Sequence, residues 1–292
     1  MTQKNKALLL ILLAALLGAG IAPFSKLALK QLPSAQFNLL RFLVAALVLV
    51  PWFVYKKHRL FWQDIKSLFL VSLLAVANTT LFIFALRYTS ASNSQILYAA
   101  VPLVVASVSY FSIGERFPKL KLLGLLVGFV GLVFVIVSPL ADAQPFSRQS
   151  LLGNVMIVLG IVAFSFYSVL SKKLQTRYSP FILTFSFVLS TILVQLILLP
   201  FLPGSWHLPS SLSLTTALCV FYVGALGMAL HYLVYQKAIN IATPTVASAM
   251  LYLQPIFAVI LASFLLGERL TWSLFLGGLV VFAGVAMLGY SK

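Results

Sequence analysis

The chain has 292 residues, of which 62% are hydrophobic and 8% are charged, and its mean hydropathy is +1.08. Soluble domains carry about 25% charged residues, so this composition excludes a soluble globular protein. The formal charge of +16 does not indicate nucleic-acid binding, because no soluble domain is available to present a basic face, and no nucleic-acid partner is expected.

Apolar stretches of about 20 residues, the length needed to cross the hydrocarbon core of a bilayer, recur along the whole chain. They are continuously apolar and lack the alternation of a membrane barrel, which predicts helices rather than strands. The predicted transmembrane helices are, in chain order, Ala7–Leu29, Ala35–Tyr55, Ile65–Leu86, Ala91–Ile113, Lys119–Ser138, Leu151–Ser171, Pro180–Leu202, Leu214–Gln236, Thr243–Leu266 and Trp272–Tyr290.

Lysine and arginine residues are distributed unequally between the two sides of the predicted bundle. The side that holds both termini and the even-numbered loops carries 14 cations, the other side carries 5, and Arg41 lies within a span. Cytoplasmic loops of membrane proteins carry the excess of Lys and Arg. The bias therefore predicts a multi-pass protein of the plasma membrane (the inner membrane of a bacterium) with both termini in the cytoplasm.

The chain contains an internal sequence repeat: Ala85–Val135 aligns with Ala238–Leu288 without a gap, at a constant offset of 153 positions. Each half holds five predicted spans, an odd number, so the second half must cross the membrane upside down. Inverted repeats give two interchangeable packings, one open to each side of the membrane. The predicted fold is an all-α integral membrane protein of ten transmembrane helices, arranged as two inverted five-helix repeats over residues 1–142 and 143–292.

The most specific matches between the halves are Gly114-Glu115-Arg116 with Gly267-Glu268-Arg269, each closing a span that carries a proline and preceding a glycine-rich span. This pattern resembles the EamA-type transporters of the drug/metabolite transporter superfamily, over nearly the whole chain. Arg41 and the stretch Ala85-Leu86-Arg87-Tyr88-Thr89 also look like elements of that family. The resemblance implies a transporter of small metabolites that often exports amino acids and related compounds. One departure is that Ser186 stands at the second-repeat position equivalent to Arg41.

Two polar residues at repeat-related positions are expected deep in the membrane, Asn78 and, at the offset of 153, His231. Polar side chains are costly in lipid, so both are expected to face a cavity or another helix. A helix–helix hydrogen bond and a substrate cavity both fit; we favour the cavity, and assign Thr79, Tyr232 and Tyr235 on the same turns to it. His231 is the only deep group whose charge changes near neutral pH, so it is expected to set any pH dependence.

Aromatic residues well inside the spans are further candidates for a solute pocket, because a buried tyrosine hydroxyl needs a partner. These are Tyr98, Phe164, Tyr167 and Tyr252, with plain packing as the alternative. Arg41 lies within reach of the interface, so it is expected either to pair with a helix carbonyl end or to contact a substrate carboxylate.

Matched residues at turns and in mid-span are candidates for gates and hinges. Pro102 and Pro255 each remove a backbone hydrogen bond in mid-span and are expected to kink their helices. Glu115 and Glu268 could form gate ion pairs, the alternative being an exposed charge at a helix start that complements the dipole. The motif that Gly124 opens, with a second glycine four residues later, serves close packing within the protein or dimerisation.

Several kinds of chemistry have no residues to support them. All four acids, which are Asp64, Glu115, Asp142 and Glu268, are predicted outside the spans, so no carboxylate relay is expected at depth. No phosphate-binding loop, metal-ligand spacing or nucleophile–base set occurs, so no cofactor, metal site or enzymatic activity is predicted. The single cysteine, Cys219, is expected to be a buried hydrophobe.

These features together predict a secondary transporter or facilitator that moves small amphipathic metabolites across the inner membrane by alternating access, as an exporter of amino acids or related compounds. A lipid-linked solute flippase is the alternative, followed by an integral-membrane lipid enzyme, which would need polar catalytic groups clustered near one interface. The expected partners are a small-molecule metabolite and membrane lipid. The sequence leaves both a monomer and a homodimer open.

Overall fold

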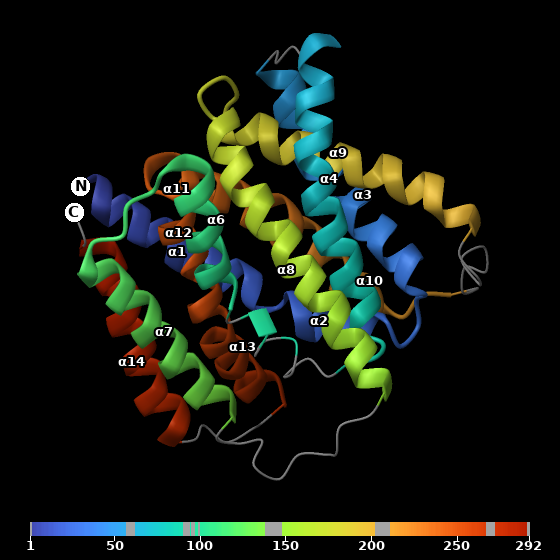
Figure 1. Ribbon diagram of the computed structural model, residues 1–292. Coiled ribbons are helices and arrows are strands. Elements are labelled where there is room, and N and C mark those ends of the chain that lie inside the picture. The colour runs from blue at the N-terminus through green and yellow to red at the C-terminus, as the bar shows by residue number, and fades with distance from the viewer. Residues whose placement is uncertain are drawn as a thin grey trace.

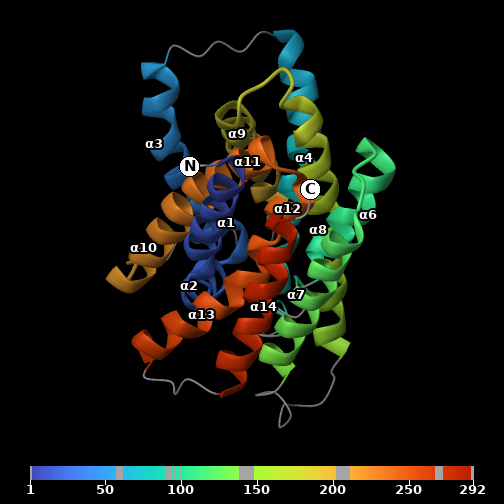
Figure 2. The ribbon, with the colours of Figure 1, turned by 90° about the vertical axis from the view of Figure 1, so that its left-hand side faces the viewer.

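The protein is an all-helical bundle in the computed structural model, and no strand occurs in the part of the chain that the model describes. Its helices cross one another in several directions around a central region (Figures 1 and 2). The described residues are 2–56, 62–89, 94, 97–98, 100–137, 148–201, 211–266 and 272–290.

Most helices fall where the apolar stretches predict them, with ends that differ by a few residues. The exception is α6, which begins at Val101, ten residues after the predicted start at Ala91, and most of the residues between lie outside the described part of the chain. Six stretches within the described residues are long and apolar enough to cross a membrane. That the chain makes ten spans in inverted repeats stays a prediction. In chain order the helices are α1 (Gln3–Ala19), α2 (Ile21–Ala28), α3 (Ser34–Tyr55), α4 (Trp62–Ala85), α6 (Val101–Ile113), α7 (Lys119–Val137), α8 (Arg148–Leu174), α9 (Pro180–Leu198), α10 (Leu214–Phe221), the π-helix η3 (Tyr222–Leu230), α11 (His231–Ile241), α12 (Pro244–Ser248), α13 (Met250–Leu266) and α14 (Trp272–Tyr290), and a short 3₁₀ turn, η2 (Leu199–Phe201), follows α9.

Helix starts use the side chains that the local sequence offers. The hydroxyls of Ser179, Ser213 and Thr243 accept hydrogen bonds from backbone N–H groups three residues later, at the starts of α9, α10 and α12. Such caps satisfy donors that the first helical turn leaves free. Gly114 ends α6 with φ = 65°, a left-handed conformation that glycine adopts at little cost.

The predicted mid-span kinks are located differently in the structure. Pro102 is the second residue of α6, where its missing N–H would have no helical partner in any case. Pro255 lies inside α13, and the break in that region comes earlier, at Ala249 between α12 and α13. A further interruption is η3, where backbone bonding widens to the π-helical pattern. The discontinuities of the second half therefore precede its matched proline.

Helices α7 and α14, the last predicted span of each half, lie side by side (Figures 1 and 2) and share the largest contact in the bundle. Glycines make this approach possible, since a Cβ atom added to Gly284 would collide with the backbone of Gly128. A Cβ atom at Gly124 would lie 2.8 Å from the carbonyl oxygen of Gly284. The motif formed by Gly124 and Gly128 thus packs the two halves together and is not free to form a dimer contact in this arrangement.

This close packing predicts a clear difference between two alanine substitutions on α14. Gly284→Ala is expected to lower the thermal unfolding midpoint of the purified protein, because overpacking typically costs about 1–3 kcal/mol. Gly278→Ala is the matched control, since the nearest atom to its added Cβ is the Ile256 Cδ1, at 3.9 Å. Equal midpoints for the two variants would contradict the role assigned to the glycine contact.

Candidate functional site

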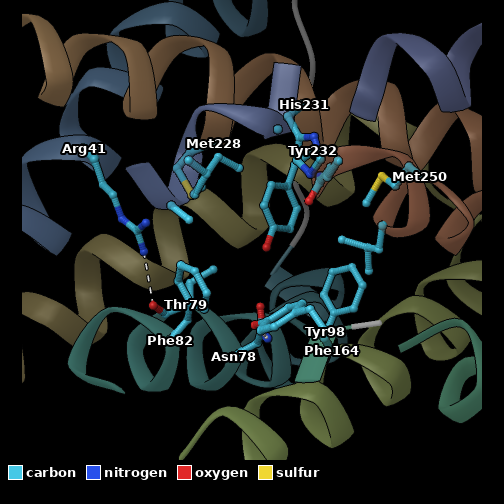
Figure 3. Close-up of a pocket in the computed structure, with 15 residues that line it drawn as sticks. Arg41, Asn78, Thr79, Phe82, Tyr98, Phe164, Met228, His231, Tyr232 and Met250 are labelled. Carbon is cyan, nitrogen blue, oxygen red and sulfur yellow. Dashed lines mark hydrogen bonds between the residues drawn. The ribbon is translucent and has the colours of Figure 1, made fainter. Parts of the chain in front are cut away.

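A central cavity of about 70 Å³ lies where helices from both halves of the chain converge (Figure 3). Its walls come from α1–α4 and Tyr98 of the first half and from α8, η3, α11 and α13 of the second. Apolar and aromatic side chains form most of the wall, and a few polar groups point inward, which is the usual make-up of a small-molecule site. The lining residues are Gly18, Ile21, Ala22, Arg41, Asn78, Thr79, Phe82, Tyr98, Phe164, Met228, His231, Tyr232, Met250, Leu251 and Gln254.

The structure brings most of the predicted solute-binding residues to this cavity. Figure 3 shows Asn78 and Thr79 on α4 opposite His231 and Tyr232, the first two residues of α11. These two pairs are related by the offset of 153 that links the repeats. The predicted residues that line the cavity are Arg41, Asn78, Thr79, Tyr98, Phe164, His231 and Tyr232.

Three predicted pocket residues lie elsewhere in the described structure. Gln236 Nε2 donates to the Tyr167 hydroxyl (2.9 Å), and the Tyr235 hydroxyl donates to Ser168 Oγ (2.7 Å). The Tyr252 hydroxyl donates to the Leu125 carbonyl (3.1 Å). The three hydroxyls are used in helix–helix hydrogen bonds, which was the packing alternative for these residues.

Asn78 is held by hydrogen bonds on one side and faces the cavity on the other. Its Nδ2 donates to the Tyr98 hydroxyl (2.7 Å) and to the Gly160 carbonyl (2.9 Å), so it joins α4, Tyr98 and α8. His231 is buried, and its Nδ1 lies 2.8 Å from the Ala14 carbonyl oxygen. This bond fits a proton on Nδ1 whether the ring is neutral or charged, so the predicted pH dependence through His231 stays a prediction.

Arg41 is 1% exposed and lies far deeper than a snorkelling side chain would. Its Nε donates to Asn38 Oδ1 (2.9 Å), and its Nη2 donates to the Thr79 carbonyl (3.2 Å), the bond drawn in Figure 3. The Thr80 hydroxyl in turn accepts from Asn38 Nδ2 (3.3 Å) and Gln195 Nε2 (2.9 Å). This chain of bonds fixes the guanidinium beside the cavity. The predicted pairing with a carbonyl is present, and the contact with a substrate stays a prediction.

The π-helix η3 allows Arg41 to be held in this place. A Cβ atom at Gly224 would lie 2.5 Å from the Arg41 carbonyl oxygen and 2.6 Å from Val44 Cβ, so only glycine lets α3 lie this close to η3. Arg41 also lies over the rings of Phe37 and Phe42, at 5.6 and 5.2 Å from their centroids. Aromatic faces stabilise a cation that has left water.

Sequence reasoning missed one polar cavity residue, Gln254 on α13. It was overlooked because the search used repeat-related polar pairs, and the first-half equivalent of Gln254 is Val101. Deep polar groups are also more numerous than the sequence analysis assumed, since Asn38, Gln195 and Gln236 are all fully buried. A search for every amide side chain in the middle of a span would have found Gln254.

Two of the four acids, Glu115 and Asp64, are buried in the protein. Glu115 is 9% exposed, not an exposed charge at a helix start: it pairs with Lys121 and accepts a hydrogen bond from the Thr245 hydroxyl (2.8 Å). Lys121 Nζ also lies 3.4 Å from the Thr243 hydroxyl. Glu115, Lys121, Thr243 and Thr245, here named the Glu115 cluster, join the α6–α7 turn of the first half to the start of α12 in the second. Glu268 and Asp142 lie outside the described residues.

Asp64 differs from its predicted position outside the spans, since it lies in the first turn of α4 and is buried. The Tyr178 hydroxyl donates to its carboxylate (2.6 Å), and Arg177 Nη2 lies 3.3 Å from the same oxygen. These partners come from the turn between α8 and α9, which explains how a carboxylate is tolerated there.

A second cavity, of about 480 Å³, opens between the start of α1, the α6–α7 turn, the α11–α12 turn and α14. Glu115 and Lys121 are among its lining residues, and Lys4 and Arg116 are exposed at its mouth. The Glu115 cluster therefore lies at the end of the bundle that carries the N-terminus. Cys219 is a buried free thiol, as expected.

Comparison with known proteins gives two kinds of match. The profile of the EamA-like transporter family matches residues 5–137 and 151–290. An uncharacterized transporter of Archaeoglobus fulgidus is 30% identical over 97% of both chains, and an uncharacterized transporter of Clostridium kluyveri is 25% identical over 88% of this chain and 83% of its own. A solved crystal structure shows the same fold, with a TM-score of 0.79 at 18% identity over 97% of this chain and 96% of that one.

Proposed function

This chain belongs to the EamA-like transporter family and is a multi-pass membrane transporter, and on that premise we propose that its central cavity is a solute site reached alternately from the two sides of the membrane. The protein would act as a secondary transporter or facilitator for small amphipathic metabolites. Export of amino acids or related compounds across the inner membrane is the proposed physiological direction and substrate range.

The observation that carries this proposal is that polar residues from both halves meet in one cavity. Asn78 and His231 occupy equivalent repeat positions and line the same 70 Å³ space. Pockets that hold drug-sized ligands measure about 300–1,000 Å³, so in this proposal the cavity is the solute site in a contracted state. Rocking of one half against the other would enlarge it on one side at a time.

Two lysines support the structural equivalence of the two halves. Near the end of the first predicted span of the first half, Lys26 Nζ donates to the carbonyls of Leu86 (3.2 Å) and Thr89 (3.0 Å). Near the end of the equivalent span of the second half, Lys172 Nζ donates to those of Ile239 (2.7 Å) and Ala242 (3.0 Å). The accepting residues are again related by the offset of 153. Each half therefore ties its first helix to the end of its third in the same way.

The Glu115 cluster supports a barrier at one end of the bundle. Its carboxylate belongs to the first half and its Thr245 partner to the second, so the contact must part if the halves separate there. In the proposed topology this end is cytoplasmic. In the sequence, the 153-offset equivalents of Glu115, Thr245 and Lys121 are Glu268, Ser92 and Leu274, so the lysine is not repeated in the other half.

Two other functions remain as alternatives. A lipid-linked solute flippase would need a lateral opening between helices, whereas a cavity lined by polar groups of both halves favours the transporter. An integral-membrane lipid enzyme would need a reactive set at one interface, and no group of three metal-ligating side chains occurs in the described part of the chain. A panel of radiolabelled metabolites offered to proteoliposomes, with and without a pH gradient, tests the transporter proposal. No uptake above protein-free vesicles for any metabolite would contradict it.

The proposed topology places both termini in the cytoplasm. The 14 to 5 cation bias motivates this, and Gln3 and Lys4 near the start of the chain line the same second cavity as Leu288 near its end. A fluorescent protein fused after Lys292 is expected to fluoresce in living cells, because it folds in the cytoplasm. A fusion that becomes active only when it is exported would contradict both the topology and the inverted repeats.

A further inference from the structure

Two buried polar groups in the cavity have no hydrogen-bond partner among the described residues. Gln254 is 8% exposed and Tyr232 is 5% exposed, and both line the central cavity. Figure 3 shows the Tyr232 hydroxyl pointing into the space. Both groups are therefore available to whatever fills the cavity.

The position of the Gln254 side chain is itself constrained by α1. A Cβ atom at Gly18 would collide with Gln254 Nε2 and would lie 2.8 Å from His231 Cε1. The glycine thus leaves room for the amide to lie over α1 at the edge of the cavity. An uncommitted amide held in place by its surroundings offers both a donor and an acceptor in a fixed position.

The described wall of the cavity carries a positive charge and no negative charge. Arg41 is the only charged side chain among the described lining residues, and no lining residue is an acid. Its guanidinium is stabilised by Asn38, the Thr79 carbonyl and two aromatic rings, none of which carries negative charge. A buried cation without a counter-charge favours an anionic ligand, and a guanidinium suits a carboxylate.

We propose that the cavity takes a small monocarboxylate that carries a second hydrogen-bonding group. The carboxylate binds on the Arg41 side, and the second group forms one hydrogen bond, with the Gln254 amide, while the Tyr232 hydroxyl lines the space beside it. Gln254 is thus a specificity-determining residue. The inference rests on the proposed transport function and names the substrate class of the same site. A cationic solute is excluded, because Arg41 repels it and the described wall offers no acid.

Four three-carbon probes separate the contributions of charge and of the second group. Lactate carries both a carboxylate and a hydroxyl, propionate carries only the carboxylate, lactamide carries the hydroxyl without charge, and 1-amino-2-propanol is a cation. Uptake into proteoliposomes at pH 7, above that of protein-free vesicles, is expected to be fastest for lactate. Propionate is expected to be about fivefold slower, the effect of losing one neutral hydrogen bond. Lactamide and the cation are expected to stay at background.

Substitutions at Gln254 test the assignment of the second group. Gln254→Leu is expected to lower lactate uptake to the propionate rate while propionate uptake stays unchanged. Gln254→Glu is expected to abolish uptake of both anions and to admit 1-amino-2-propanol, because the cavity then carries a carboxylate. Gain of cation uptake cannot result from misfolding. Gln175→Leu is the matched control: this half-buried glutamine bonds to Gln236 away from the cavity and should leave the ratio of the probes unchanged.

Several results would overturn the proposal. Lactamide moving as fast as lactate would remove the role of charge, and Gln254→Leu slowing all probes equally would make Gln254 a structural residue. If the wild type moves none of the four probes but does move another member of the metabolite panel, the substrate class is wrong and the transporter stands. If it moves nothing in either set, the transport function fails as well.

Discussion

Replacing Arg41 by methionine is expected to abolish transport while the protein still inserts and can be purified. Arg41 is buried beside the cavity and donates to Asn38 Oδ1 and the Thr79 carbonyl. Truncating one partner of a buried charge pair costs about 2–5 kcal/mol, so a bound anion that loses Arg41 loses about two orders of magnitude or more in affinity. Initial uptake rates in proteoliposomes, normalised to inserted protein, measure the effect.

Two further variants separate charge from structure at this position. Arg41→Lys keeps the charge but loses the planar fork that bonds Asn38 and the Thr79 carbonyl together, so an intermediate rate is expected. Arg87→Met is the control, since Arg87 is exposed just after the end of α4 and surface changes usually stay within about 0.5 kcal/mol. Wild-type transport by Arg41→Met would assign Arg41 to plain structure.

Replacing Glu115 by alanine is expected to open the cytoplasmic end of the protein and to slow transport strongly. The substitution leaves Lys121 buried without its counter-charge and removes the acceptor of the Thr245 hydroxyl. Removing one partner of a buried ion pair costs about 3–5 kcal/mol. This cost destabilises only the conformation in which the pair forms, so the equilibrium is expected to shift toward the conformation in which this end is open. An exposed helix-end charge, the other interpretation open from the sequence, would give only a small effect, and the burial of Glu115 does not fit that interpretation.

The shift can be followed with a cysteine beside the Glu115 cluster. Val246 on α12 is buried and lines the second cavity together with Glu115 and Lys121. In a Cys219→Ser background, Val246→Cys is expected to react slowly with a membrane-impermeant thiol reagent added on the side that the second cavity faces. Glu115→Ala is expected to raise its labelling rate at least several-fold. Lys119→Gln, an exposed charge change at the start of α7, is the control and should leave the rate unchanged. Equal rates in all three proteins would contradict the role of the Glu115 cluster as a barrier.

Much of the helical architecture could be predicted from the sequence, because bilayer thickness fixes the length of an apolar helix. Hydrophobicity does not report the local breaks, so the π-helix η3 and the interruption at Ala249 were not foreseen. Both depend on neighbouring helices: Gly224 in η3 is where α3 packs against it. Pro102 and Pro255 do restrict the local backbone, but the breaks of the second half lie elsewhere, at η3 and Ala249.

The site residues could be predicted from the sequence where the repeat relates two polar positions. They could not be predicted where the rotation of a helix about its axis determines which side chains face the cavity. Asn78 and His231 were found because the duplication pairs two costly polar groups, and both line the cavity. Phe164 and Tyr167 are three residues apart on α8, yet only Phe164 lines the cavity, because the tyrosine hydroxyl pairs with Gln236 on α11. When a helix is apolar on every side, the sequence does not show which face points inward.

The central claim is that Asn78 and His231 line one cavity that opens alternately to the two sides of the membrane. Thiol labelling of Asn78→Cys and His231→Cys, each in a Cys219→Ser background, tests it most directly. Both cysteines are expected to react with small impermeant reagents added from either side, and a transported solute from the panel is expected to protect them. If neither cysteine is labelled in any condition, or if excess solute never protects either one, the pair is a helix–helix contact and the account of the cavity is contradicted.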